Sequence, residues 1–248
     1  MWAGGYPRIH AGKLDAGHWL NDYIATYVER DVRQLTHLGD WATFRTFLRL
    51  AAGRTAQEIN LSSLGNDCGV SHNTIREWLS LLEIGFIIHC LPPWHGNLNL
   101  RWIKSPKLHF LDSGLVCALL RIRKPRQLAT HPLRGAIFET WAVDEILKYR
   151  LNRNRTMGAV FHLRQTRGLE LDAMIDDGGR QTSVEVKSAA TISAAQYANL
   201  LRFRQQMADA SETRRAPPDL RLIYGGEQAS TRQGVDVIPW NAIAQHEW

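Results

Sequence analysis

Three side chains in the C-terminal half of the chain, Asp172, Glu185 and Lys187, have the types and spacing of a hydrolytic site. We expect Asp172 and Glu185 to face each other across a β-hairpin, where the Cβ atoms of opposed residues are about 5 Å apart. Two carboxylates at that range repel each other unless a proton or a cation lies between them, and Mg²⁺ or Mn²⁺ would suit their hard oxygen ligands. Such an ion activates water for attack on phosphorus, and Lys187 would orient that water or neutralise the pentavalent phosphorus.

The register of this hairpin follows from its turn. Gly178 and Gly179 favour a two-residue loop, because glycine accepts positive φ, between strands predicted over residues 169–175 and 182–187. Counting outward from the loop places Asp172 opposite Glu185 and Glu170 opposite Lys187 on one face. The opposite face is apolar and carries Leu171, Ala173, Ile175, Val184 and Val186.

A helix predicted over residues 132–149 precedes these strands, with Glu139 beside its apolar stripe. Another strand is predicted over residues 160–164, and a helix and two further strands follow the hairpin. Because Glu139 lies beside the apolar stripe of its helix, we expect it at the edge of the core.

Glu139, Asp172 and the Glu185-Val-Lys187 triplet resemble the PD-(D/E)XK nuclease superfamily, over about residues 131–239. The resemblance implies that Glu139, Asp172 and Glu185 hold the metal and that Lys187 assists the water. No proline precedes Asp172, which departs from the motif. The alternative is a nuclease fold whose carboxylates no longer support catalysis and which is retained for binding or as a scaffold.

Residues 60–83 have the pattern of a helix-turn-helix, with a turn at Gly69 and a second helix that Ser71 can cap. A strand predicted over residues 84–91, and a turn leading into a second strand over residues 94–103, would complete a winged helix. The residues expected to contact DNA are His72, Asn73, Thr74, Arg76, Arg101, Lys104 and Lys107. Many winged helices bind only protein, and Glu77 favours that alternative because a carboxylate is repelled by phosphates.

The remaining patterns divide the chain into segments. Helices are predicted over residues 19–35 and 41–52, a buried strand over residues 107–112 and a short helix over residues 115–120. The expected organisation is a helical N-terminal segment, a winged helix, a basic linker that could also touch nucleic acid, and a restriction-endonuclease-like α/β domain. Their ranges are 1–57, 58–120, 121–130 and 131–248, and the fold class is mixed α/β.

The composition narrows the classes of function. The 248 residues are 44% hydrophobic and carry a formal charge of +6, which excludes disorder and favours an anionic partner such as nucleic acid. Three cysteines without a CxxC spacing favour a reducing cytoplasm over a disulfide framework or a zinc site. No apolar run is long enough for a membrane span, and no GxxxxGK[ST] motif provides an ATP site.

A wider resemblance covers nearly the whole chain. Successive motifs are similar to the second part, domain of unknown function 4143, of an uncharacterised bacterial and archaeal family with an AAA-type ATPase domain. The motifs are Gly4-Gly-Tyr-Pro7, Tyr27-Val-Glu-Arg-Asp-Val32, the helix-turn-helix, Pro92-Pro93 through Asn97, Lys104-Ser-Pro-Lys-Leu-His-Phe-Leu-Asp-Ser-Gly-Leu115, Gly135-Ala-Ile-Phe-Glu139, Glu170-Leu-Asp172 and Glu185-Val-Lys187. The resemblance implies an ATPase partner or a missing ATPase domain, so that the chain is a fragment or a stand-alone descendant.

The sequence therefore predicts a DNA-binding protein with a Mg²⁺- or Mn²⁺-dependent endonuclease site. The alternative is a non-catalytic DNA-binding or protein-interaction module that regulates an ATPase partner. A transcription regulator with a ligand-sensing C-terminal domain also fits the winged helix, but it leaves the opposed carboxylates unexplained.

Overall fold

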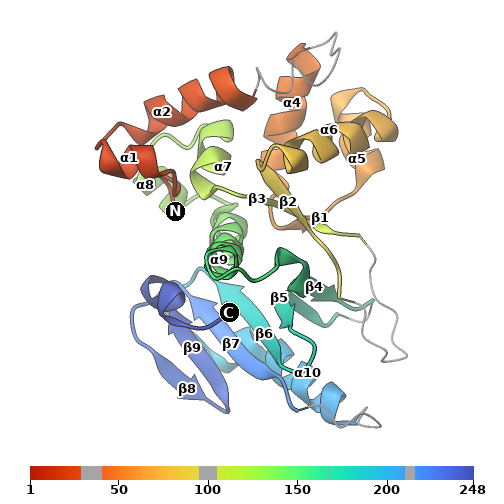
Figure 1. Ribbon diagram of the computed structural model, residues 1–248, viewed down its shortest axis with the longest axis vertical. Coiled ribbons are helices and arrows are strands. Elements are labelled where there is room, and N and C mark those ends of the chain that lie inside the picture. The colour runs from red at the N-terminus through yellow and green to blue at the C-terminus, as the bar shows by residue number, and fades with distance from the viewer. Residues whose placement is uncertain (29–40, 95–104, 167, 210–215) are drawn as a thin grey trace. The chain divides into compact units, whose positions relative to one another are not determined.

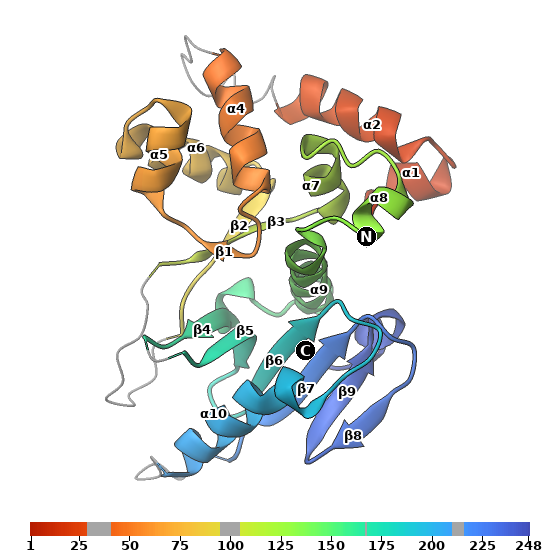
Figure 2. The same cartoon turned by 180° about the vertical axis from the view of Figure 1, so that it is seen from behind.

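The computed structural model describes residues 1–28, 41–94, 105–166, 168–209 and 216–248. The chain forms two compact units, one of Met1–Cys90 with Lys107–Trp141 and one of Leu91–Pro106 with Ala142–Trp248. Figures 1 and 2 show the helices and strands of each unit from opposite sides. Helices together with a six-stranded mixed sheet confirm the predicted mixed α/β class.

The first unit contains most of the helices and a three-stranded sheet in the order β1-β3-β2. Its elements are α1 (Pro7–Ala11), α2 (Ala16–Tyr23), the π-helix η1 (Ile24–Val28), α4 (Trp41–Ala52), β1 (Gln57–Glu58), α5 (Leu61–Cys68), α6 (His72–Ile84), β2 (Ile88–Leu91), β3 (Lys107–Phe110), α7 (Ser113–Leu119), α8 (Pro125–Ala129) and the start of α9 (Arg134–Leu151). The predicted helix over residues 41–52 is confirmed at both ends.

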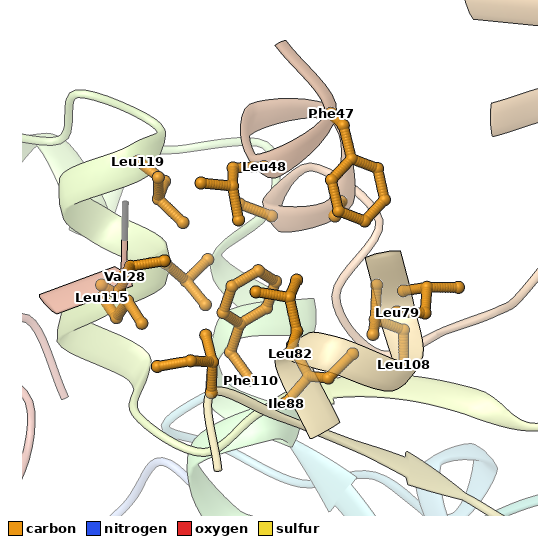
Figure 3. Packing of buried hydrophobic residues seen from close by; sticks show 14 of the residues in the cluster. Val28, Phe47, Leu48, Leu79, Leu82, Ile88, Leu108, Phe110, Leu115 and Leu119 are labelled. Carbon is orange, nitrogen blue, oxygen red and sulfur yellow. The ribbon is translucent and has the colours of Figure 1, made fainter. Parts of the chain in front are cut away.

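The largest apolar cluster of this unit packs α4, α5, α6 and α7 against the small sheet, and a smaller cluster of Ile9, Ala16 and Leu20 joins α1 and α2. Figure 3 shows Phe47 and Leu48 from α4, Leu82 from α6 and Phe110 from β3 among the members of the largest cluster. Apolar residues three and four apart on each helix produce this inward face, and complete burial of one such side chain contributes about 2 kcal/mol.

The first unit differs from expectation at strand β2 and in the expected linker. Strand β2 begins at Ile88 instead of residue 84, because α6 continues to Ile84. Within the expected linker, Pro125 begins helix α8 and Leu128 is buried in the apolar cluster, so these residues are part of the packed unit. Most of residues 94–103, expected as a turn that leads into the second wing strand, lies outside the described residues.

The second unit contains the six-stranded sheet, in the order β4-β5-β6-β7-β9-β8. Its elements after α9 are η2 (Met157–Ala159), β4 (Val160–Arg164), β5 (Glu170–Asp176), β6 (Gln181–Lys187), η3 (Ala194–Tyr197), α10 (Ala198–Asp209), β7 (Asp219–Tyr224), β8 (Ser230–Arg232), β9 (Val235–Pro239) and η4 (Trp240–Gln245). Three strands follow α10, one more than the sequence predicted.

The topology of this sheet changes at β6. Strands β4, β5 and β6 form an antiparallel meander, whereas β6, β7 and β9 are parallel. Helix α10 makes the crossover between β6 and β7 and packs against β5, β6 and β7 (Figure 2).

In the described part of the chain, no helix is both long enough and apolar enough to cross a membrane.

The β5–β6 hairpin closes through a two-residue loop, as predicted. Asp177 N–H donates to the Arg180 carbonyl at 3.2 Å, and Gly178 and Gly179 lie between them. Gly178 has φ of 81°, whereas Gly179 has no positive φ, which is typical of a II′ turn.

A buried arginine joins this turn to α9. Arg150, near the end of α9, is 1% exposed and makes a bidentate pair with Asp177 through contacts of 2.6 and 3.1 Å. Its hydrogen bonds lower the pKa of Asp177. The position of the turn is thereby tied to the preceding helix.

The turn geometry predicts different costs for substitution at the two glycines. Gly178→Ala should lower the free energy of unfolding by roughly 1 kcal/mol, because a Cβ is unfavourable at positive φ. Gly179→Ala is the matched control and should be nearly neutral, since neither glycine has another atom within 4 Å of an added Cβ. Urea unfolding of both variants measures the difference; equal losses would contradict the described turn.

Candidate active site

The predicted hairpin register is confirmed from Asp176 as far as Ala173. Pairs from Asp176 with Gln181 to Ala173 with Val184 follow the expected count, and the next rung would pair Asp172 with Glu185. On its other side β5 has a bulge: Met174 pairs with Phe161 and Leu171 with Leu163, so Asp172 and Ala173 together oppose one residue of β4.

The bulge changes which face two of the neighbours occupy. Leu171 and Met174 belong to the same apolar cluster although they are three residues apart, whereas the sequence placed Leu171 on the face of Ala173. Bulges commonly redirect a side chain next to a functional site. Here the bulge includes Asp172, one of the three candidate metal ligands.

Asp172, Glu185 and Lys187 lie together, as the sequence predicted. The Lys187 ammonium is 2.7 Å from Glu185 Oε2 and 3.8 Å from Asp172 Oδ2. Asp172 Oδ2 accepts a hydrogen bond of 2.8 Å from Val186 N–H, and Asn199 Nδ2 of α10 donates to Glu185 Oε1 at 3.3 Å. Both carboxyl groups are therefore fixed by the backbone or by a neighbouring helix.

The burial of these carboxyl groups determines their electrostatics. Asp172 is 6% exposed and Glu185 is 3% exposed. Burial, and then the neighbouring Asp172 carboxylate, raise the pKa of Glu185 to about 9 against the opposing effect of Lys187. One nearby ammonium thus leaves the pair short of positive charge at neutral pH, and Glu185 holds a proton.

This arrangement fits a divalent cation. Two carboxyl groups on adjacent strands offer oxygen ligands, and the raised pKa shows that further positive charge would be stabilising there. Among the residues that the structure describes, no group of three or more His, Cys, Asp and Glu side chains is close enough to hold a metal ion. Asp172 and Glu185 would be the ligands from the second unit.

Glu139, the third expected ligand, belongs to the first unit. Its Oε1 accepts from the Lys107 ammonium at 3.0 Å, and Lys107 is only 2% exposed. Lys107 was expected at the surface as a phosphate contact; instead it is buried, because it compensates the charge of Glu139. The convergence of Glu139 on the Asp172 and Glu185 pair stays a prediction.

The candidate DNA-binding residues of α6 are mostly exposed, as predicted. His72, Asn73 and Arg76 are at the surface, with Arg76 Nη1 donating to Asn73 Oδ1 at 2.8 Å. Thr74 is half-buried, and its backbone N–H donates to the capping Ser71 Oγ at 3.1 Å. Arg101 and Lys104 lie outside the described residues.

Sequence reasoning missed two residues that shape the site. Asn199 contacts Glu185 from α10, and Arg150 holds the hairpin turn. Neither belongs to a local motif, since each acts on a residue more than ten positions away. Their spacing in the sequence gives no signal for these contacts.

The chain belongs to the family described as Domain of unknown function (DUF8612), which matches residues 1–126. A second family, described as Domain of unknown function (DUF4143), matches residues 134–243. The resemblance to domain of unknown function 4143 is therefore confirmed for the C-terminal part, and the N-terminal part matches a separate family.

Two curated relatives are similar along most of the chain. An uncharacterized protein of Mycobacterium tuberculosis and one of Mycobacterium bovis are each 27% identical over 230 residues. The alignments cover 92% of this chain and 49% of each relative. The chain thus spans about half the length of these relatives.

The electrostatics of Glu185 predict a pH dependence in the presence of a chelator. The native carboxyl keeps its proton up to about pH 9, whereas an unfolded one loses it near 4.5, so native stability should fall as the pH rises between these values. Glu185→Gln has no titrating group at position 185. Its free energy of unfolding should therefore depend less on pH, and it should be more stable than the natural protein at pH 8.

Urea unfolding at pH 5 and pH 8 measures this difference. Glu227→Gln, which changes an exposed acid of the same unit, is the matched control and should keep the natural slope. An unchanged slope in Glu185→Gln would contradict the described environment of Glu185.

Proposed function

We propose that the second unit is a nuclease domain that hydrolyses phosphodiester bonds of DNA with the help of Mg²⁺ or Mn²⁺. The observation that carries the proposal is the buried pair of Asp172 and Glu185 with the Lys187 ammonium beside both. Buried carboxyl groups of like charge are costly for stability, and a cation-dependent reaction gives this arrangement a use.

The order of elements supports the same proposal. Helix α9 precedes the β4–β5–β6 meander, and α10 leads to β7, which pairs with β6 in parallel. Helix, three strands, helix and strand is the core order that the resemblance to the PD-(D/E)XK superfamily implies. Asp172 on β5 and Glu185 on β6 occupy the corresponding strands.

Each side chain then has a distinct role. Asp172 and Glu185 would hold the ion, with Glu139 as the proposed third ligand. When bound, a divalent cation activates water and offsets charge on the attacked phosphate. Lys187 would release its contact with Asp172 and orient the attacking water or neutralise charge on phosphorus.

We propose that the first unit binds the DNA through a winged helix. Helices α5 and α6 are joined through Gly69 in the left-handed conformation, and strands β1, β3 and β2 form the small sheet. His72, Asn73 and Arg76 offer exposed donors and acceptors on α6 that suit base edges and phosphates. The cytoplasm is the proposed location, since Cys68, Cys90 and Cys117 are free thiols.

A specific observation favours the non-catalytic alternative. Exposed Ile84 and Phe86 follow Glu77 at the end of α6 and are 69% and 71% exposed. An apolar pair and a carboxylate suit a protein partner better than phosphates, and the resemblance implies that this partner is an AAA-type ATPase. In that case Lys187 permanently compensates the two carboxylates and no turnover occurs.

Substitutions in the pair should separate catalysis from binding. Asp172→Asn or Glu185→Gln should abolish Mg²⁺- or Mn²⁺-dependent cleavage while DNA affinity is kept, because ligand charge is lost with little change in shape. Lys187→Met should lower the rate by about 10²-fold or more with less effect on metal affinity. Gel assays on supercoiled, linear, branched and single-stranded DNA measure cleavage, with Glu227→Gln as the active control.

Two results would contradict the nuclease proposal. Activity unchanged in Asp172→Asn would place the reaction at another site or in a contaminant. Complete inactivity on every substrate, with Mn²⁺ bound and the fold intact, would favour the non-catalytic module.

DNA binding should depend on salt. Each phosphate contact releases counterions, so the logarithm of affinity should fall with the logarithm of salt concentration by about 1 per contact. Arg76→Gln should weaken binding and reduce this slope by about 1, whereas Arg8→Gln, an exposed charge on α1, should do neither. Fluorescence anisotropy at several salt concentrations measures both quantities; affinity that is insensitive to salt would instead support a protein partner.

A further inference from the structure

A cationic pocket lies within the first unit, among elements that the proposed function does not use. It has a volume of about 250 Å³. Its walls come from α2 and η1, from α4, and from the end of α7. The lining residues are Asn21, Ile24, Ala25, Arg45, Leu48, Arg49, Ala118, Leu119 and Arg121.

The charged residues in the described part of the lining have one sign. Of the nine lining residues that the structure describes, three are arginines and none is acidic. Within the described ranges, the guanidinium groups of Arg49 and Arg121 have no hydrogen-bond or ion-pair partner. Because guanidinium groups in one pocket repel each other, an anion bound between them would be stabilised by several charges together.

Arg121 has a backbone conformation that is unusual for an arginine. Arg121 follows the end of α7 with φ of 59°, in the left-handed region that favours glycine after a helix. An arginine there is unfavourable for the backbone and gives no described contact in return. A bound anion would provide that contact.

Part of the pocket lining is apolar. Leu48 of α4 and Leu119 of α7, both labelled in Figure 3, contribute to it together with Ile24. A ligand with an anionic group and an apolar or aromatic body fits such a lining better than a free inorganic ion. The two cations of Arg49 and Arg121 favour a dianion over a monoanion, so a phosphate monoester is preferred to a carboxylate.

We propose that this pocket binds a phosphate monoester carried on one ring system, with the phosphate on Arg49 and Arg121. The same chemistry occurs in a free nucleoside monophosphate and in the 5′-terminal phosphate of a nucleic-acid strand. The proposal is independent of Asp172 and Glu185, because the pocket is built entirely from the first unit.

The test is calorimetric titration of the full chain with AMP, with adenosine, and with a short oligonucleotide carrying either a 5′-phosphate or a 5′-hydroxyl. AMP or the 5′-phosphorylated oligonucleotide should bind more tightly than its counterpart without the phosphate, adenosine or the 5′-hydroxyl oligonucleotide. Arg49→Gln and Arg121→Gly should each weaken binding by about tenfold or more, since hydrogen bonds between charged groups are lost. Arg126→Gln, an exposed charge on α8, is the matched control and should bind as the natural chain does.

Arg121→Gly separates a loss of binding from a loss of folding. Glycine accepts the positive φ, so the melting temperature should be kept or raised while binding is lost. A preference for the 5′-phosphorylated oligonucleotide without binding of AMP would assign the strand end, and the reverse would assign the free nucleotide. Absence of both, or binding that neither variant weakens, would overturn the proposal.

Discussion

Two carboxyl groups that are buried together must share a positive charge, and the second unit is organised around that requirement. Asp172 and Glu185 are nearly inaccessible to water, so their repulsion is poorly screened. In the described contacts the compensation comes from Lys187, from Val186 N–H, from Asn199 and from the proton that the raised pKa leaves on Glu185. A divalent cation, as proposed above, would add positive charge to the same pair.

The fold keeps the pair from separating. Strand β6, which carries Glu185, is paired with β5 on one side and with β7 on the other. Arg150 anchors the hairpin turn through Asp177, and the bulge at Asp172 directs its carboxylate to the backbone of β6. Geometry that is fixed in this way favours binding of an ion without reorganisation of its ligands.

The sequence predicted the hairpin well because the relevant signals are local. Gly178 and Gly179 define the turn, and the period of two along each strand then fixes the register as far as Ala173. The bulge lies beyond that reach, because it arises from the pairing of β5 with β4. Leu171 was therefore assigned to the wrong face.

Long-range compensation explains the other differences. Lys107 has the character of a surface residue in the sequence, but it is buried because Glu139, on a distant helix, offers it a carboxylate. The expected linker includes Leu128, whose burial depends on a core formed by other segments. The period of the apolar residues predicts which face of a helix or strand is buried, but it does not predict what that face packs against.

The most direct test of the central claim is anomalous diffraction from a crystal of the protein soaked with Mn²⁺. We expect an anomalous peak bounded by Asp172 and Glu185, with the Lys187 ammonium displaced from Asp172. The absence of a peak, with Lys187 still in contact with both carboxyl groups, would contradict it.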